Sequence, residues 1–331
     1  MDETFNPAAS APDDFRPATG DHREEEQKAF VNQSYWHDVF HRFCANKGAV
    51  IGLIFIVLIL LFAIFGPMLS HYSYRTVDPL STNLKPRIPG LEKLGIFSGY
   101  NDSVSTAYHY FGTDNLGRDL FTRVAQGTRV SFEIAGLAVL CDVLLGVVYG
   151  LVSGYFGGKV DMVMQRITEV LNSIPTMIVV TLLLLIIKPG MGSIIIAMML
   201  TGWINMSRIV RAQVLKVKEQ EFVLAANTIG DTNRNIIFKE ILPNAMGQII
   251  VTFMFSIPNA IFMEAFLAFI GLGIPAPMAS LGSLINDGYK SAMIYPHMIL
   301  SPVIILALLM LSFNLFADGL RDAIDPQMKQ I

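Results

Sequence analysis

Two acidic side chains interrupt stretches of sequence that are otherwise almost free of charge. Asp142 lies near the middle of the apolar segment 130–154, and Glu264 lies toward one end of the segment 241–274. A charge within a membrane is costly and usually faces the interior of a helix bundle or a water-filled path. For Asp142 we weigh contact with a substrate amino group or a gating pair against a protonated or hydrogen-bonded role at a subunit interface, which we favour. For Glu264 we expect a structural or gating role.

The other residues that could do chemistry form no catalytic or metal-binding pattern. The two cysteines, Cys44 and Cys141, and the six histidines are not placed at metal-ligand spacing. A nucleotide-binding P-loop needs Gly-x-x-x-x-Gly-Lys followed by Ser or Thr. In the nearest candidate, Ser153 replaces the first glycine and Val160 replaces the hydroxyl residue. We therefore expect no catalytic residue, no metal and no bound cofactor in this chain, and no enzyme activity of its own.

The composition places the chain in a membrane. Of its 331 residues, 53% are hydrophobic and 15% are charged, with a net charge of −3, whereas a soluble domain carries about 25% charged residues. This excludes a soluble enzyme, a disulfide-stapled domain and a nucleic-acid binder. Six apolar segments approach or exceed the roughly 20 residues that a membrane-spanning helix needs. They are 48–69, 130–154, 162–187, 189–207, a segment within 241–274, and 298–317. Since only a helix satisfies every backbone group of such a segment in lipid, we predict an all-α membrane protein with six transmembrane helices. Pro175 either kinks the third helix or starts it.

The distribution of Lys and Arg predicts how the chain is oriented. One side holds most of them, whereas the short loops of the other side hold only Lys188 and Lys290. Since cytoplasmic loops are enriched in these residues, we expect a multi-pass cell-membrane protein with both termini in the cytoplasm. The predicted parts are a cytoplasmic tail 1–47, disordered over about its first 25 residues, a first transmembrane helix 48–69, an external segment 70–129, a five-helix core 130–318 with a cytoplasmic loop 208–245, and a cytoplasmic tail 319–331.

The loop 208–245 predicts two short helices with a tight break between them. Phe222, Val223, Ala226 and Ile229 recur at helical spacing and would form one apolar stripe. Gly230 follows where a helix commonly ends, because glycine accepts the left-handed conformation. Asp231 or Thr232 can cap the next helix, which would run to Ile241-Leu242-Pro243. The alternative is an amphipathic segment that lies on the lipid surface.

The same loop resembles the cytoplasmic signature of the permease subunits of bacterial ABC importers. The resemblance rests on Ala225-Ala226, Gly230 and Ile241-Leu242-Pro243, while Leu224 stands where the family usually has Glu. Three further segments, 111–129, 264–282 and 318–326, are similar to segments of oligopeptide and dipeptide permeases. The similarity is greatest to the second of the two permease subunits, which has a longer cytoplasmic N-terminus.

This resemblance implies a type I importer permease fold and an ATP-driven uptake of oligopeptides or dipeptides. In that family the cytoplasmic loop forms a coupling helix that seats in a groove on the ATPase subunit. The residues that would contact the ATPase are Glu221, Ala225, Ala226, Gly230, Asp231 and Pro243. Glu264 matches the family pattern, and Asp142 and Glu264 are both candidates for the transport pathway or its gate. The implied partners are a second permease subunit, two ATPase subunits that use ATP and Mg, and an external peptide-binding protein.

The external segment 112–129 predicts an amphipathic helix at the outer membrane interface. Leu116, Leu120, Phe121 and Val124 would share one face of that helix. Its polar residues Asp114, Arg118 and Asp119 are candidates for contact with the binding protein, while packing of this segment on the chain's own spans is the alternative that we favour.

Two other functions remain open from the sequence. An ion-coupled secondary transporter would use discontinuous helices and ion sites near the midplane, to which Asp142 and Pro175 give slight support. The loop 208–245 argues against it, since a secondary carrier has no partner for that loop to engage. An importer permease for another small solute, such as a nickel chelate, would have a similar sequence.

Overall fold

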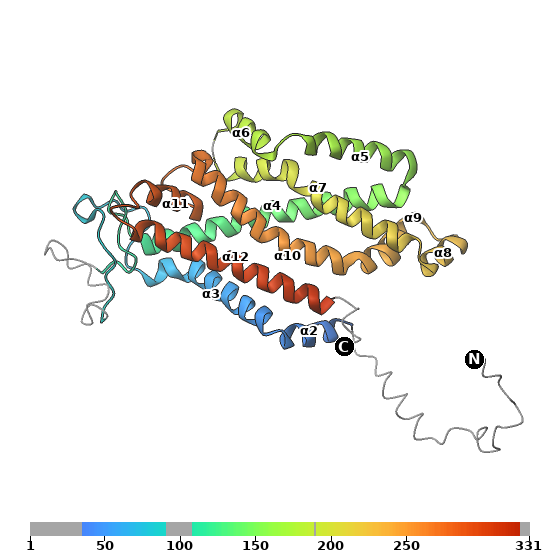
Figure 1. Ribbon diagram of the computed structural model, residues 1–331, viewed down its shortest axis with the longest axis horizontal. Helices are drawn as coiled ribbons and strands as arrows, with labels where there is room; N and C mark the ends of the chain where they lie inside the picture. The colour runs from blue at the N-terminus through green and yellow to red at the C-terminus, as the bar shows by residue number, and fades with distance from the viewer. Residues whose placement is uncertain (1–34, 91–107, 189, 325–331) are drawn as a thin grey trace, which may run out of the picture.

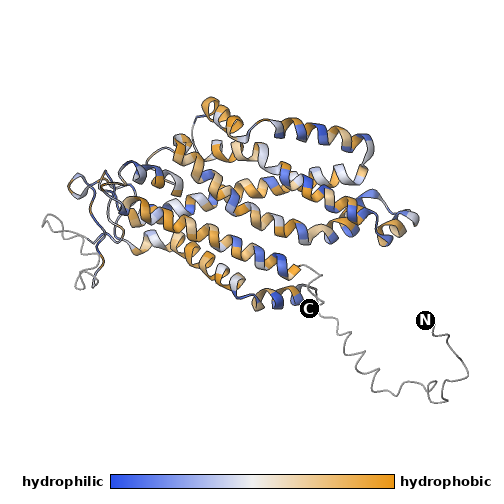
Figure 2. Cartoon of the chain, in the orientation of Figure 1, coloured by the Kyte–Doolittle hydropathy of each residue, from blue (hydrophilic) through white to orange (hydrophobic). Residues whose placement is uncertain are grey.

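The chain folds into a bundle of long helices that lie side by side (Figure 1). The computed structural model describes residues 35–90, 108–188 and 190–324. These ranges contain helices and isolated β-bridges, such as the one between Thr113 and Asp119. Figure 2 shows that apolar residues cover the long helices, whereas polar residues gather at the two ends of the bundle.

Five helices are long and apolar enough to cross a membrane by themselves. They are α3 (Lys47–Leu69), α4 (Leu120–Phe156), α7 (Met191–Lys218), α10 (Leu242–Leu267) and α12 (His297–Ile324). The π-helical turn η5 (Ile236–Ile241) runs directly into α10, and a second π-helical turn, η6 (Ala268–Leu272), follows it. The all-α membrane fold predicted from the sequence is confirmed.

The third predicted span, 162–187, is a pair of helices rather than one. α5 (Gly158–Ser173) and α6 (Thr176–Ile186) meet at a bend of 77° and reach spanning length only together. A proline lacks the backbone N–H that a helix interior needs and pushes the preceding residue out of the α conformation. Ile174, directly before Pro175, is extended at φ −90° and ψ 125°. Of the two predicted roles of Pro175, the start of a helix is confirmed, because α6 begins directly after it; the segment 162–187 is therefore two helices.

Short elements mark the two ends of the bundle. One end carries α2 (Tyr35–Ala45), α8 (Glu221–Thr228) and α9 (Asn233–Asn235), and we refer to it as the α8 end. The opposite end, referred to as the α11 end, carries the 3₁₀ turn η3 (Pro79–Ser81) and α11 (Leu281–Lys290). The start of α2 and the end of α12 both lie at the α8 end (Figure 1).

Glycines at four-residue spacing bring α4 and α7 into close contact. A Cβ atom on Gly150 would lie 2.6 Å from the carbonyl oxygen of Ser207, and a Cβ on Gly154 would lie 2.8 Å from the Cβ of Val214. Gly146, one turn earlier, meets Met206 in the same way. Small residues at such spacing allow the backbones of membrane helices to approach closely. α4 and α7 therefore pack as a rigid pair through the centre of the bundle.

The second span starts ten residues earlier than the predicted residue 130. Asp119 caps α4, because its carboxylate accepts a hydrogen bond of 2.9 Å from the backbone N–H of Thr122. Leu120 and Val124 are buried in the first turns of α4. The expected interfacial helix over 112–129 is therefore wrong: the part before Leu120 is a loop, and the rest belongs to the spanning helix because its apolar residues face protein rather than lipid.

Two boundaries of the predicted tails also change. Residues 35–45 of the predicted tail 1–47 form α2, and residues 319–324 of the predicted tail 319–331 extend α12. The predicted disorder of the first 25 residues and the remainder of the C-terminal tail lie outside the described residues. Both corrected segments are helical because they pack against each other. Val39 and Phe43 of α2 are buried in one cluster with Ala323 of α12, and Leu320 and Ile324 pack against that cluster.

Candidate functional sites at the two ends of the bundle

The break after α8 is a Schellman motif centred on Gly230. Gly230 has a φ of +82°. The backbone N–H of Asp231 donates to the carbonyl oxygen of Ala226 at 3.1 Å, and the backbone N–H of Gly230 donates to the carbonyl oxygen of Asn227 at 3.1 Å. These two bonds are the signature of this helix ending, which favours glycine in the left-handed position. The predicted helix–break–helix arrangement is confirmed in its geometry.

Asp231 and Thr232 start the next helix, as the sequence suggests. The Thr232 hydroxyl caps α9 by accepting from the backbone N–H of Asn235 at 3.3 Å. The Asp231 carboxylate accepts from the side-chain amide of Asn235 at 2.8 Å and from the N–H of Thr232 at 2.7 Å. These two donors lower the pKa of Asp231 below its usual value, the Asn235 amide most, because they stabilise the charged form. The loop thus holds an ionised carboxylate at its turn.

The predicted apolar stripe of α8 divides between two faces. Val223 and Ala226 are buried against η5 and the start of α10. Phe222 and Ile229 point away from the bundle, and Ile229 is 83% exposed. Leu224, in the position where the permease family usually has Glu, is exposed as well. Phe222 and Ile229 lie on one side of the helix, and Leu224 lies on nearly the opposite side. We call these three exposed side chains together the outer face of α8.

The predicted coupling residues have different environments. Glu221, Ala225, Gly230 and Pro243 are exposed, and Asp231 is half-buried. Ala226 is buried, so its methyl group packs on the chain itself and does not face a partner. The assignment of Ala226 to a contact surface is therefore corrected, since the turn of α8 directs this side chain inward.

Polar contacts fasten this loop to the end of α4. The Tyr155 hydroxyl and the Asn233 side-chain oxygen are 2.9 Å apart, which joins α4 to α9. The Lys218 ammonium donates to the Tyr155 carbonyl at 2.6 Å and lies 5.6 Å from the centre of the Tyr155 ring. Nearby, the Arg211 guanidinium holds the Asp161 carboxylate with two bonds of 2.6 Å and ties α5 to α7. The loop is therefore attached to the rigid α4–α7 pair.

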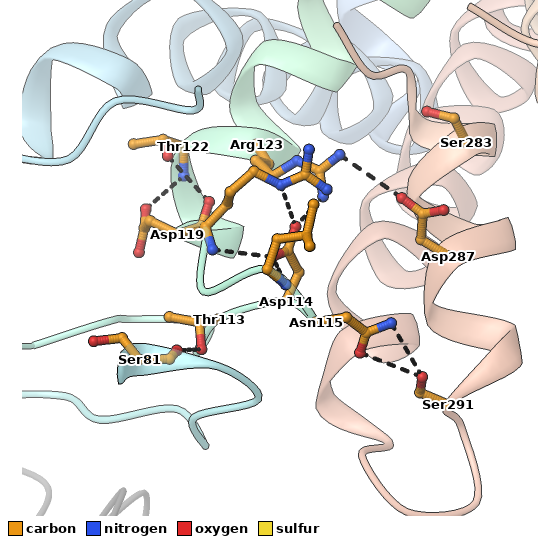
Figure 3. A network of polar contacts seen from close by, with 12 residues as sticks. Ser81, Thr113, Asp114, Asn115, Asp119, Thr122, Arg123, Ser283, Asp287 and Ser291 are labelled. Atoms are coloured by element: carbon orange, nitrogen blue, oxygen red, sulfur yellow. Dashed lines mark hydrogen bonds and ion pairs between the residues drawn. The ribbon is translucent and has the colours of Figure 1, made fainter. Parts of the chain in front are cut away.

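A buried polar network occupies the α11 end (Figure 3). Asp114 accepts hydrogen bonds from the Arg118 side chain at 2.7 Å, from the Leu116 N–H at 2.8 Å and from the Arg123 guanidinium. On its other side, Arg123 pairs with Asp287 of α11 at 3.7 Å. A charge-assisted bond inside a protein is stronger than one in water. The network thus fixes the loop before α4 against α4 and α11.

The three residues predicted to contact a binding protein lie inside this network. Asp114, Arg118 and Asp119 are each at least nine-tenths buried. Asp119 also meets the ring nitrogen of the buried His109 at 2.9 Å, in addition to capping α4. Their assignment to a contact surface is therefore corrected, because their polar atoms are engaged within the chain. Sequence reasoning missed Asp287, whose separation from Arg123 along the chain concealed the pair.

Glu264 lies in the core rather than in an open path. Its side chain is fully buried, and one carboxylate oxygen accepts a hydrogen bond of 2.8 Å from the Ser131 hydroxyl. The same hydroxyl accepts from the backbone N–H of Leu281 at 3.2 Å. Glu264 and Ser131 thus join α10, α4 and the start of α11. This arrangement corresponds to the structural role among those expected for Glu264.

Asp142 has a different environment from Glu264. It is half-buried on α4 beside Gly202 of α7, where an added Cβ would collide with its carboxylate. Its Oδ1 atom is buried and has no hydrogen-bond partner among the described residues. The role at a subunit interface that we favoured from the sequence stays a prediction, because it would involve a second chain. As for metals, residues 35–90, 108–188 and 190–324 contain no group of three His, Cys, Asp or Glu side chains that could hold one.

The fold is that of an ABC importer permease. The inward-facing MetNI methionine ABC transporter matches with a TM-score of 0.51 at 16% sequence identity, and the match covers 61% of this chain and 96% of that one. In sequence, residues 146–330 match the family described as "Binding-protein-dependent transport system inner membrane component". Residues 34–86 match the "N-terminal TM domain of oligopeptide transport permease C". The chain therefore belongs to the family of inner membrane components of binding-protein-dependent transport systems.

Permease proteins of peptide transport systems match along almost the whole chain. The oligopeptide transport system permease protein OppC of Bacillus subtilis is 43% identical over 316 residues, which are 96% of this chain and 97% of that protein. The dipeptide transport system permease protein DppC of the same species is 41% identical over 309 residues, or 93% and 91% of the two chains. OppC of Escherichia coli is 41% identical over 302 residues, or 91% and 94%. The resemblance inferred from the sequence is confirmed, and the ion-coupled secondary transporter is not supported.

Proposed function

We propose that this chain is one of two permease subunits of an ATP-driven importer of oligopeptides or dipeptides. The observation that carries the proposal is the extent of identity to peptide-system permeases, which spans nearly the full length of both proteins. The second permease would complete the pathway, because importers of this kind alternate between two packings of a pair of such bundles.

The outer face of α8 is the proposed contact with an ATPase subunit. Phe222, Leu224 and Ile229 are large, apolar and exposed. An exposed apolar patch with a polar rim is typical of a protein interaction site. ATP and Mg would be bound by the ATPase subunits, and the bonds from the α8 loop to Tyr155 would carry their movement to α4.

This contact sets the proposed orientation. If α8 meets an ATPase, the α8 end and both termini face the cytoplasm, in agreement with the distribution of Lys and Arg. The α11 end then faces outward, toward a peptide-binding protein. Because Asp114 and Arg118 are buried, the proposed contact there is the exposed tip Asn115–Leu116, which the Asp114 carboxylate holds in place.

Asp142 is the proposed pathway residue. Its side chain is half-buried beside Gly202, and Asn205, one turn along α7, is exposed. Polar groups exposed at the middle of a membrane face a bundle interior or a water-filled cavity rather than lipid. We therefore assign this side of the α4–α7 pair to the pathway, where a carboxylate suits the ammonium group of a peptide. Glu264 is assigned a structural role.

The test is reconstitution of the chain with its candidate partners in proteoliposomes. We expect uptake of a labelled peptide and ATP hydrolysis stimulated by the loaded binding protein, and no uptake by the chain alone. A nickel chelate serves as the competing solute. Uptake by the isolated chain would refute the importer, whereas ATP-driven uptake of the chelate without uptake of peptide would refute the substrate.

A further inference from the structure

The short helix α2 has one broad apolar side, and the described residues cover only part of it. Val39 and Phe43 are 6% and 7% exposed and pack on the last turns of α12, where the Phe43 and Phe316 ring centres are 5.2 Å apart. Trp36 and Phe40, by contrast, are 55% and 67% exposed. Exposed Cys44 continues their line at four-residue spacing. Large aromatic side chains exposed in this way indicate an interaction surface.

The chain turns at Asn46, so that α2 does not project away from the bundle. α3 and α12 are antiparallel: Gly52 packs at Phe316, Ala49 at Gly319, and Asn46 bonds Asp322. A helix that continued straight from α3 would place the residues before Asn46 beyond the end of α12.

Phe43 instead meets Phe316, at the level of Gly52. Leu320 and Ile324 of α12 pack against the same cluster as Val39 and Phe43. The extended backbone of Asn46, with φ −80° and ψ 102°, makes this turn. α2 therefore lies alongside the last turns of α12, at the same depth as the start of α3.

That depth is the boundary between lipid and water. α3 has 23 residues, which is about 34 Å at 1.5 Å per residue and enough to cross the hydrocarbon core of about 30 Å. Its first residue, Lys47, is exposed, and Asp318, Arg321 and Asp322 mark the corresponding level on α12. α2 thus lies where the apolar part of the bundle ends.

We propose that α2 lies in the lipid–water interface at the α8 end, with Trp36 and Phe40 inserted among the lipids. Tryptophan and other aromatic side chains are favoured at this depth, and an amphipathic helix inserts its apolar face there. The proposal requires only that α3 spans the membrane. It does not depend on which solute is transported.

Lipid fits this surface better than a protein partner does. α3, which follows α2 directly, exposes apolar side chains too, among them Ile51, Ile54 and Leu58. Since α3 is a membrane span, an apolar surface of α2 at the depth of its start meets the same lipid. The exposed His37, His41 and Lys47 would lie beside the headgroups.

Tryptophan fluorescence tests the proposal directly, because the sequence holds only two tryptophans. Trp203→Phe leaves Trp36 as the sole emitter in the full chain, reconstituted in phosphatidylcholine vesicles. The vesicles contain lipid brominated either near the headgroup or near the end of the acyl chain. Because an interfacial helix is buried roughly 5–10 Å into the boundary, the shallow bromine should quench Trp36 at least about twofold more than the deep one. Trp36→Phe gives the matched control, with Trp203 on α7 as the emitter.

Two results would overturn the proposal. Quenching of Trp36 by aqueous acrylamide but not by brominated lipid would place α2 in water. Protection from both quenchers would show that protein covers Trp36. A spin label on Cys44, in a chain with Cys141→Ala, supplies a measurement that retains both tryptophans. We expect this label to collide more often with oxygen than with a water-soluble nickel chelate, and the reverse order would contradict the interfacial position.

Discussion

Replacement of Gly230 by valine isolates the role of the break after α8. Gly230 has a φ of +82°, and no heavy atom lies within 4 Å of an added Cβ. The effect of a side chain is therefore on the backbone alone, since there is nothing for it to strike. An L-residue in the left-handed conformation costs about 1–2 kcal/mol. Strain of this size lowers the population of the native loop by a factor of about 5–30 relative to relaxed alternatives.

Under the proposed function, this population controls how often the outer face of α8 is presented to the ATPase. In the reconstituted importer, Gly230→Val should lower peptide uptake by at most about 5–30-fold, with normal membrane insertion. Gly230→Asn should lose less, because Asn tolerates the left-handed conformation. Gly136→Ala is the matched control, since this exposed helical glycine also has open space around it and an ordinary φ. Full uptake and full stimulation of ATP hydrolysis by Gly230→Val would refute the coupling role of this break.

Three further substitutions test the packing and the pathway. Arg123→Ala removes a buried partner of Asp114 and should destabilise the chain by about 3–5 kcal/mol. We expect a lower thermal unfolding temperature in detergent. An unchanged temperature would contradict the role of the network in stability. Gly150→Leu should separate α4 from α7 at Ser207 and cost about 1–3 kcal/mol or more, seen in the same assay. Asp142→Asn should insert normally but slow peptide uptake by about tenfold or more, because a bond to a charged group contributes about 1.5–3 kcal/mol. Wild-type uptake by this last variant would exclude Asp142 from substrate contact.

The spans and the α8 loop could be predicted because their signals are local. An apolar run of about 20 residues has few structures open to it in lipid. Gly230 needs only its own backbone conformation to end α8. Pro175 likewise acts on its immediate neighbours, although its effect, a bend of 77° between two helices, is larger than the kink we considered.

The remaining features depend on contacts between distant residues. Arg123 pairs with Asp287, and Asp161 pairs with Arg211, across separations that no local pattern encodes. The buried state of Asp114 follows from these contacts, whereas the sequence shows only a polar loop residue. Similarly, only two side chains of α2, Val39 and Phe43, are buried, and both are buried by packing against α12. The sequence of α2 alone does not show this contact. Patterns of polarity thus identified which segments matter but not which side of each faces protein.

The helix α4 has polar contacts with the candidate sites at both ends of the bundle. α4 has 37 residues, or about 55 Å at 1.5 Å per residue. Asp119 and Arg123 fix it to the network at the α11 end, and Tyr155 bonds Asn233 at the α8 end. Its glycines hold it against α7, so movement of the loop at Tyr155 either shifts both helices together or breaks their packing. The bend at Pro175 lies outside this rigid pair. Since conformational changes concentrate at residues between packed elements, we expect changes in the shape of this subunit to involve the α5–α6 bend.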